Sequence, residues 1–336
     1  MELIDLTLIW IVIIGVGVFM YVLMDGFDLG VGILFPFAPD DNARDEMMSS
    51  VAPVWDGNET WLILGGAGLL AAFPMVYAVF LPALYIGVFL LLAGLIFRGV
   101  AFEFRFKADP ESRHRWDWSF FGGSTVAAFA QGAVAGAYIQ GFEVEGFSYV
   151  GGPLDWLSAF TVMTGLGVVA GYALLGVTWT ILKTEGNTRD WAYQLAPKLL
   201  AAVMVFFVIV SIWTPLASEH VRERWFDHVT ALWIFPLLTV LTAAWVFSKL
   251  RKRSDVAPFI GSMTLFALFY IGLLISMWPY AVPPDHTFWD AASDPGSQLF
   301  LLLGVLFLIP IILGYTAWTY WVFRGKVKAG EGYAGH

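Results

Sequence analysis

The chain alternates long apolar runs with short polar loops. Asp, Glu, Lys and Arg are all absent between Trp61 and Phe97, and six later stretches show the same pattern. Those stretches are 119–142, 156–182, 199–218, 229–248, 256–284 and 295–323. A run of about 20 apolar residues is long enough for a helix to cross the hydrocarbon core of a bilayer. The pattern therefore predicts an all-α polytopic membrane protein.

Nine transmembrane helices are predicted, and the break at residues 74–77 should fold the second and third into a tight hairpin. The ranges are about 7–36, 50–73, 77–104, 117–140, 157–183, 197–218, 228–249, 256–279 and 297–323. No linker is long enough to separate soluble domains. Residues 1–336 are therefore predicted to form a single membrane domain.

The composition agrees with this class. The 336 residues are 59% hydrophobic and 13% charged, with a mean hydropathy of +0.73, whereas soluble domains carry about 25% charged residues. The chain has no cysteine, which excludes disulfides, thiolate-ligated iron–sulfur clusters and cysteine zinc sites within it. The net charge of −9 lies in the loops and does not indicate nucleic-acid binding.

The distribution of basic residues predicts the orientation. Of the 18 Lys and Arg residues, all but Arg222 and Arg224 fall on one predicted side of the membrane. Because basic residues favour cytoplasmic loops, that side is assigned to the cytoplasm. With nine helices, the N-terminus is then outside and the C-terminus is cytoplasmic.

Acidic residues interrupt two of the predicted helices. Asp25 and Asp28 lie three residues apart in the first helix, and Asp56 and Glu59 repeat this spacing in the second. Residues three apart share a helical face. An ionisable group in a membrane span costs roughly 2.5–3.5 kcal/mol on insertion scales, so such groups are functional candidates by default.

Arg98 is the one basic residue expected inside the first three spans. Asp56 precedes Met75 by about 19 residues and Arg98 follows it by about 23, which places both within about 6 Å of the same depth. We therefore expect Asp56 and Arg98 to pair. Trp55 and Asn58 are expected to support this pair, with Asn58 hydrogen-bonded to Asp56. A structural ion-pair network would account for this pair. The surplus of carboxylates over one arginine favours a proton path, because some of these groups should hold protons near neutral pH.

The five histidines lie in predicted loops, at helix ends or at the C-terminus. No pair is placed to ligate a haem within the membrane. No catalytic, cofactor-binding or metal-binding residue is therefore predicted in this chain, and any redox centre should sit in a partner.

Three segments carry a family resemblance: "MDGFDLGVG" (24–32), "APVWDGNETWLILGGAGLLAAFP" (52–74) and "FRGVAFEFR" (97–105). In these segments, and over nearly its full length, the chain resembles the second subunit of bacterial cytochrome bd quinol oxidase, and looks closest to the shorter, cyanide-insensitive-type branch. The resemblance implies two four-helix bundles plus one additional helix, in the bacterial cytoplasmic membrane. The family's membrane acids are associated with proton delivery and map onto Asp25, Asp28 and Asp56. Glu59 stands where some relatives have Gln.

The resemblance also implies an electrogenic heterodimer. The complex oxidises ubiquinol or another quinol and reduces oxygen to water with four electrons, which generates a proton gradient without pumping. The haem-bearing subunit 1 would carry two b-type haems and one haem d. A small single-helix accessory subunit and a structurally bound quinone are further expectations.

Two other functions stay open. The acid cluster could be the substrate site of a proton-coupled secondary transporter, although transporters often show matching interruptions in two halves and no acid cluster recurs in the later helices. The chain could also be a purely structural assembly subunit. For the partner interface, the glycine-rich face of the first helix and the aromatic face of the last are candidates.

Overall fold

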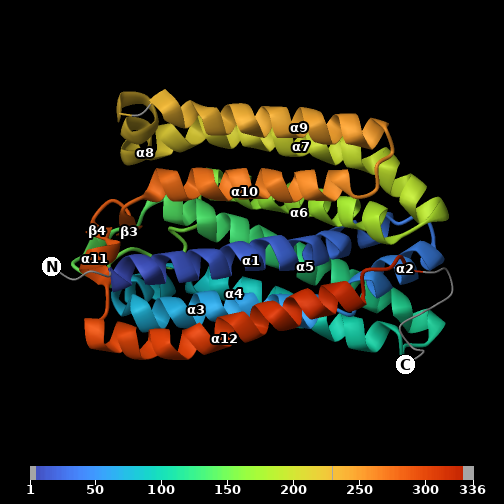
Figure 1. Ribbon diagram of the computed structural model, residues 1–336, viewed down its shortest axis with the longest axis horizontal. Coiled ribbons are helices and arrows are strands. Elements are labelled where there is room, and N and C mark those ends of the chain that lie inside the picture. The colour runs from blue at the N-terminus through green and yellow to red at the C-terminus, as the bar shows by residue number, and fades with distance from the viewer. Residues whose placement is uncertain (1–4, 229, 328–336) are drawn as a thin grey trace.

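A computed structural model describes residues 5–228 and 230–327, and long helices run along its longest axis (Figure 1). The all-α prediction is confirmed. Nine helices in these residues have 18 or more residues, and seven of them are long and apolar enough to cross a membrane. The other two are α3, which has polar residues in its first turns, and α5, which is rich in small residues. The nine are α1 (Leu6–Leu34), α3 (Trp55–Ala72), α4 (Pro74–Arg105), α5 (Pro110–Gln140), α6 (Ala159–Lys183), α7 (Gly186–Ala217), α9 (Ile234–Arg251), α10 (Ala257–Met277) and α12 (Pro295–Val322).

Shorter elements lie between and beyond these helices. Two antiparallel hairpins, β1–β2 and β3–β4, lie at the end of the bundle where α1 begins. The short helical elements are η1 (Phe35–Phe37), α2 (Asp41–Val51), α8 (Glu219–Glu223), η2 (Arg224–His228), η3 (Thr230–Trp233) and α11 (Phe288–Ala291). The strands are β1 (Val144–Glu145), β2 (Ser148–Tyr149), β3 (Tyr280–Val282) and β4 (His286–Thr287).

The long helices pack in two groups of four. Helices α1, α3, α4 and α5 contact one another, and so do α6, α7, α9 and α10. The groups meet at α6, which packs against both α1 and α5, while α12 lies against α1 and α3 at the opposite edge from α7 and α9 (Figure 1). This packing corresponds to the expected two bundles and additional helix.

Glycines let α1 and α6 approach closely. A Cβ atom on Gly30 would lie 1.8 Å from the carbonyl oxygen of Tyr172, and one on Gly176 would lie 2.2 Å from the carbonyl carbon of Gly30. Small residues permit such backbone contact between membrane helices. The glycine face of α1 is thus used within the chain, and the expectation that it could form the partner interface is wrong.

The helix predicted at 50–73 begins only at Trp55, because residues 50 and 51 are the end of a separate short helix. Helix α2 ends at Val51 and α3 begins at Trp55, with Pro53 in the turn between them. Asp40 caps α2 by accepting a hydrogen bond from the backbone N–H of Ala43. Helix α2 is too short and polar to resemble a membrane span, so the pattern of apolar runs did not reveal it.

Other helices begin or end away from their predicted limits. Helix α4 starts at Pro74, which leaves only Phe73 outside the two helices of the hairpin. Helices α5 and α7 begin seven and eleven residues before the predicted starts, because their polar first turns lie outside the apolar runs (110 against 117 and 186 against 197). Helix α9 starts at Ile234 rather than 228, after η2 and η3.

Candidate functional site

A buried charged cluster joins three helices. Nη2 of Arg98 on α4 lies 2.7 Å from Oδ1 of Asp25 on α1 and also pairs with Glu59 on α3. The side chains of Arg98 and Asp25 are 0% and 1% exposed, whereas Glu59 keeps 27% of its side-chain surface. The cluster therefore has a buried interior and one half-exposed member.

Asn58 ties the second buried acid to the last helix. Its Nδ2 donates to Oδ2 of Asp28 at 2.6 Å and to the carbonyl oxygen of Met24 at 3.2 Å. Its Oδ1 accepts a hydrogen bond of 2.9 Å from the hydroxyl of Tyr320 on α12. The amide thus holds Asp28 in place between α1, α3 and α12.

Asp56 does not pair with Arg98, which corrects our expectation. Its side chain is exposed, and the arginine instead contacts Glu59, one turn further along α3. One turn changes the depth by only about 5 Å, so Glu59 lies close to the depth that was expected for Asp56. Nor does Asn58 bond Asp56 among the described contacts, because its amide faces Asp28.

Trp55 lies beside the arginine. The guanidinium carbon of Arg98 lies 5.6 Å from the centre of the Trp55 ring, and that ring stacks on Phe102 with centroids 5.0 Å apart. A cation over an aromatic face is attracted by the ring's quadrupole. The aromatic pair therefore covers one side of the buried charge.

Several polar atoms of the cluster have no hydrogen-bond partner within the described residues. They are Oδ2 of Asp25, Oδ1 of Asp28, and Nε and Nη1 of Arg98. Buried polar atoms in proteins almost always have a partner in the protein or in ordered water. The spare atoms therefore mark where water, or a proton on a carboxylate, would complete the network.

A chain of polar side chains leads away from Asp25. The Tyr172 hydroxyl donates to Oε1 of Gln131 at 2.6 Å, and Nε2 of Gln131 donates to the Tyr21 hydroxyl at 2.9 Å. Tyr21 in turn interacts with the Asp25 carboxylate. The sequence reasoning missed these residues and Tyr320, because a lone tyrosine or glutamine in an apolar run carries no charge signal.

The sequence also did not reveal a second buried arginine. Arg105 was assigned to a loop, yet its side chain is 1% exposed and lies 2.5 Å from both Asp45 of α2 and Asp117 of α5. The group links α2, α4 and α5 at their common end. Arg113 also lies 3.8 Å from Asp45, so two arginines offset the two partly exposed acids, and we regard the group as structural.

The described residues offer no site for a resident metal. No group of three or more His, Asp or Glu among them has suitable geometry. The imidazoles of His114 and His286 contact Trp118 and Gly146 respectively, far along the chain from the acid cluster, while the His228 side chain and His336 lie outside the described part.

The architecture and this cluster together define a class: a polytopic helical membrane subunit with partly neutralised acids buried among its first helices. Comparison with known proteins names the family. The family model for cytochrome bd terminal oxidase subunit II matches residues 6–323. The chain therefore belongs to the cytochrome bd terminal oxidase subunit II family, as the sequence motifs predicted.

Individual relatives agree with the family model. Cytochrome bd-I ubiquinol oxidase subunit 2 of Escherichia coli strain K12 is 32% identical, over 96% of this chain and 95% of its own length. Cytochrome bd ubiquinol oxidase subunit 2 of Bacillus subtilis is 28% identical over 97% of each chain. A chain in the structure of bd oxidase from Geobacillus thermodenitrificans has the same fold, with a TM-score of 0.79 over 95% of this chain and 99% of its own at 15% identity.

These findings bear on class and location. The chain is a subunit of a terminal oxidase, which is an oxidoreductase complex. Its seven apolar helices and bacterial relatives confirm a multi-pass protein of the bacterial cytoplasmic membrane. Family membership also removes the main reason to consider a secondary transporter.

Proposed function

We propose that this chain is the haem-free subunit of a quinol:oxygen oxidoreductase and carries protons from the cytoplasm towards the oxygen-reducing site of its partner. One observation carries the proposal: buried Asp25 shares a single arginine with Glu59, buried Asp28 is held by the neutral Asn58 amide, and both aspartates keep an unpartnered carboxylate oxygen. A purely structural ion pair needs one acid for each arginine. Surplus ionisable groups inside a membrane typify proton relays.

Uptake begins at a small cleft between α3 and α12. The cleft is lined by Gly57 and Thr316 among others, reaches Asn58 and Tyr320, and has a volume of about 20 Å³. A cavity of about 10–15 Å³ can hold one water molecule. Water in this cleft would lie beside the Asn58 amide that bonds Asp28, so Asp28 is the first carboxylate on the path.

The proton then moves within the cluster and leaves at its half-exposed side. Arg98 bonds both Asp25 and Glu59, so a proton passing through water between the carboxylates stays beside one fixed positive charge. Glu59 reaches the molecular surface, and Asp56 lies on the same helix, one turn away and exposed. Asp56 and Glu59 are thus the groups that face the proton's destination.

The haem-bearing subunit 1 would cover this surface. A carboxylate exposed to lipid raises the free energy of the protein. We therefore expect a partner protein to cover Asp56 and the exposed side of Glu59. Apolar side chains of α3 and α4, such as Ile63 and Ile96, flank this region and are 68% and 65% exposed. The partner interface is therefore proposed on the α3–α4 face, and the aromatic face of α12 remains free for lipid or a small accessory subunit.

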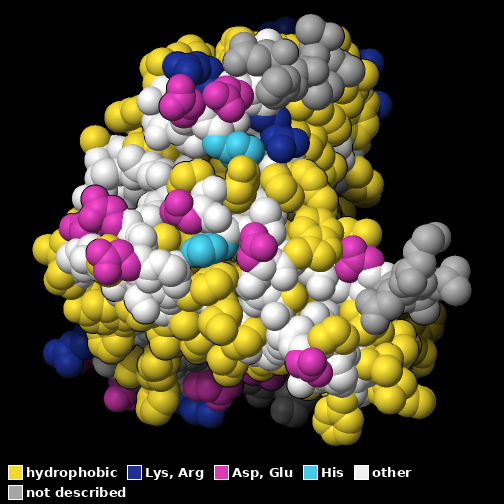
Figure 2. Space-filling model, turned by 90° about the vertical axis from the view of Figure 1, so that its left-hand side faces the viewer, with side chains coloured by type: hydrophobic (Ala, Val, Ile, Leu, Met, Phe, Trp, Pro, Cys, Tyr) yellow, Lys and Arg dark blue, Asp and Glu magenta, His cyan; other side chains and the backbone are white. Residues whose placement is uncertain are grey.

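The proposed topology has nine membrane crossings, with the N-terminus outside and the C-terminus in the cytoplasm. In support, α1 begins at one end of the bundle and α12 finishes at the other (Figure 1). Figure 2 views the end at which α1 begins, where acidic side chains are scattered over the loops. Arg222 and Arg224, the two basic residues assigned to the outside, lie at this end in α8 and η2.

The redox centres are proposed to reside in the partner, as two b-type haems and one haem d that supply electron transfer and oxygen reduction. Ubiquinol or another quinol would be the substrate of the complex. We also propose that the complex contains a structurally bound quinone and an accessory single-helix subunit.

The test is oxygen consumption by the purified complex with Asp28→Asn or Asp56→Asn. Each change removes a protonatable group at nearly constant size, and we expect turnover to fall about tenfold or more with haem content unchanged, since positioned proton transfer is worth about 10²–10⁴-fold. Asp41→Asn is the control, because Asp41 is 82% exposed and pairs only with Arg44 among the described residues.

Normal turnover in both variants would rule out the proton path. Loss of all haem would favour the purely structural subunit. A colourless chain that purifies alone would reopen the transporter alternative.

A further inference from the structure

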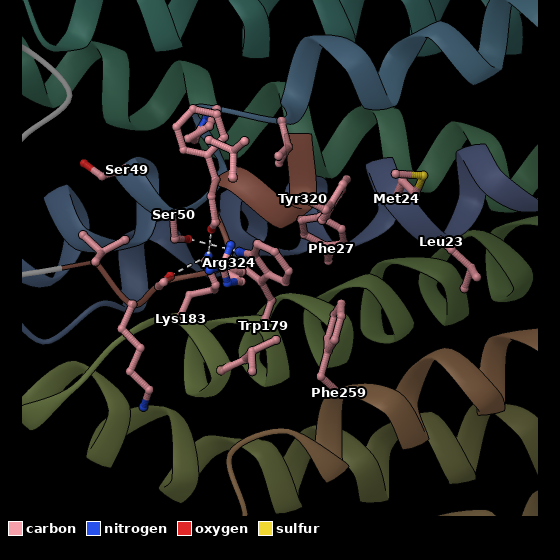
Figure 3. Close-up of a pocket in the computed structure, with 18 of the residues that line it drawn as sticks. Leu23, Met24, Phe27, Ser49, Ser50, Trp179, Lys183, Phe259, Tyr320 and Arg324 are labelled. Carbon is pink, nitrogen blue, oxygen red and sulfur yellow. Dashed lines mark hydrogen bonds between the residues drawn. The ribbon is translucent and has the colours of Figure 1, made fainter. Parts of the chain in front are cut away.

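A large cavity lies beside the acid cluster, at the end of the bundle where α1 finishes (Figure 3). Its volume is about 630 Å³, and its walls come from α1, α2, α6, α10 and the end of α12. The surface is mostly apolar, with Phe27, Trp179 and Phe259 in mutual ring contact on one side. Volumes of about 300–1,000 Å³ with apolar walls and few polar groups are typical of ligand sites.

A backbone strap of residues 323–327 closes one end of this cavity. Nζ of Lys183 donates to the carbonyl oxygens of Phe323 and Gly325, the latter at 2.7 Å. The backbone N–H of Val327 donates to the carbonyl oxygen of Lys183 at 2.8 Å. At the other end, half-buried Met20 and Met263 belong to α1 and α10, so the cavity opens sideways between helices.

Two cations line the cavity without an acidic partner. Lys183 is 6% exposed, whereas Arg324 is exposed and its Nη1 donates to the carbonyl oxygen of Trp321 at 2.6 Å. Neither cation lies within 4 Å of a carboxylate oxygen in the part of the chain described. Asp255 is the nearby acid, and it already pairs with Lys326 and Arg189. A buried charge is costly unless it is paired. The ammonium of Lys183 also has a third N–H, beyond the two that bond the strap.

From this geometry we propose that the cavity binds one anionic phospholipid, with its phosphate at Lys183 and Arg324 and an acyl chain among the apolar walls. The phosphate supplies the missing negative charge and accepts the spare N–H. The acyl chain fills a space that a soluble phosphate ion would leave open, while a neutral quinone would leave the buried charge of Lys183 uncompensated. Basic residues at membrane surfaces attract anionic lipids in the same way.

This proposal is independent of the proton path, and its readout is lipid content rather than turnover. The intact complex is washed in detergent, and the retained phosphatidylglycerol and cardiolipin are measured by native mass spectrometry. Wild type should retain about one anionic lipid per complex at this site. Lys183→Gln is slightly shorter and keeps an N–H donor for the strap but removes the charge, so affinity should fall about tenfold with the loss of one charge-assisted contact.

Three further variants sharpen the result. Lys183→Arg should retain the lipid, because it restores the positive charge. Met263→Trp should exclude the acyl chain while leaving Lys183 intact, and therefore tests the site even if Lys183→Gln does not assemble. Lys252→Gln is the matched control, since Lys252 is exposed in the same set of loops and does not line the cavity; it should retain the lipid.

Equal lipid content in wild type, Lys183→Gln and Met263→Trp would overturn the proposal. So would the absence of anionic lipid from washed wild type. Loss of lipid in Lys183→Gln and Met263→Trp, with retention in Lys183→Arg and Lys252→Gln, would establish the site.

Discussion

Arg98 and Asp25 form an ion pair, with 2.7 Å between Nη2 and Oδ1 and almost no exposed surface on either side chain. The two residues are 73 positions apart in the chain. Removing one partner of such a pair strands a charge in a medium of low dielectric. The pair thus makes each residue depend on the other.

Arg98→Met should destabilise the complex by about 3–5 kcal/mol, because it leaves Asp25 and Glu59 without their cation. Thermal unfolding of the complex in detergent measures the loss. Lys107→Met is the control, since Lys107 and its partner Glu103 are 77% and 60% exposed, and it should stay within about 0.5 kcal/mol. Equal stability of the two variants would contradict the structural dependence of the cluster on Arg98.

Tyr320→Phe should lower the free energy of unfolding less than Asn58→Leu does. The first removes one hydrogen bond to the Asn58 side chain and should cost about 1 kcal/mol. The second leaves Oδ2 of Asp28 and the Tyr320 hydroxyl unpaired, and each stranded group costs about 1–3 kcal/mol. Unfolding midpoints of the two variants, compared with wild type, test this order; a larger loss in Tyr320→Phe would refute the bridging role of Asn58.

Gly30→Ala should prevent the normal packing of α1 on α6. The added Cβ would meet backbone atoms of Tyr172 and Gly176 at 1.8 and 2.7 Å, and backbone cannot move aside without shifting a whole helix. Gly272→Ala is the matched control, because its Cβ would have nothing within 4 Å and alanine favours helices by roughly 0.5–1 kcal/mol. We expect poor assembly of the first variant and normal or raised stability of the second, measured as yield and unfolding midpoint.

Asp255 makes a pH-dependent contribution outside the membrane spans. Burial raises the pKa of its carboxyl, but hydrogen bonds from Lys326 and Tyr193 outweigh burial, and the net pKa is below the ordinary value of 3.8. The stabilisation is therefore fully present above pH 3.8 and is lost as the pH falls from there through the lower pKa of the folded state. Asp255→Asn should be less stable than wild type at pH 7, by about 1 kcal/mol for a partly exposed charged contact.

The same comparison at acid pH provides the check. The difference between wild type and Asp255→Asn should shrink when unfolding is followed below pH 3.8. A difference that stays constant from pH 7 to pH 3 would show that the carboxylate charge does not contribute.

The helix limits show where sequence reasoning succeeded and where it stopped. Apolar runs located the long helices because an apolar span longer than a bilayer has few alternatives to a helix. Helix α2 was not predicted because its eleven residues include Asp41, Arg44 and Glu46. It is a stable element only because Met47, Met48 and Val51 pack against the bundle. Local composition cannot report a contact made after the chain has folded.

The acid cluster shows the same limit. Charge in an apolar span grouped Asp25, Asp28, Asp56 and Glu59 with Arg98, since ionisable residues in a membrane gather near one another; of these, exposed Asp56 does not contact the arginine. Which carboxylate meets the arginine depends on how α3 is turned about its own axis. The sequence contains the periodicity of that helix but not its rotation relative to α4.

By itself the sequence determined the all-helical membrane class, the family and the residues that carry charge within the spans, because the bilayer penalises every exposed polar group and so leaves a strong local signal. The tertiary structure alone decided that Arg98 bonds Asp25 and Glu59 rather than Asp56. It also decided that Asn58 and Tyr320 hold Asp28, and that Lys183 faces an apolar cavity. Each of these relationships joins residues on different helices, and the relative rotation and depth of helices are set by side-chain packing over the whole bundle.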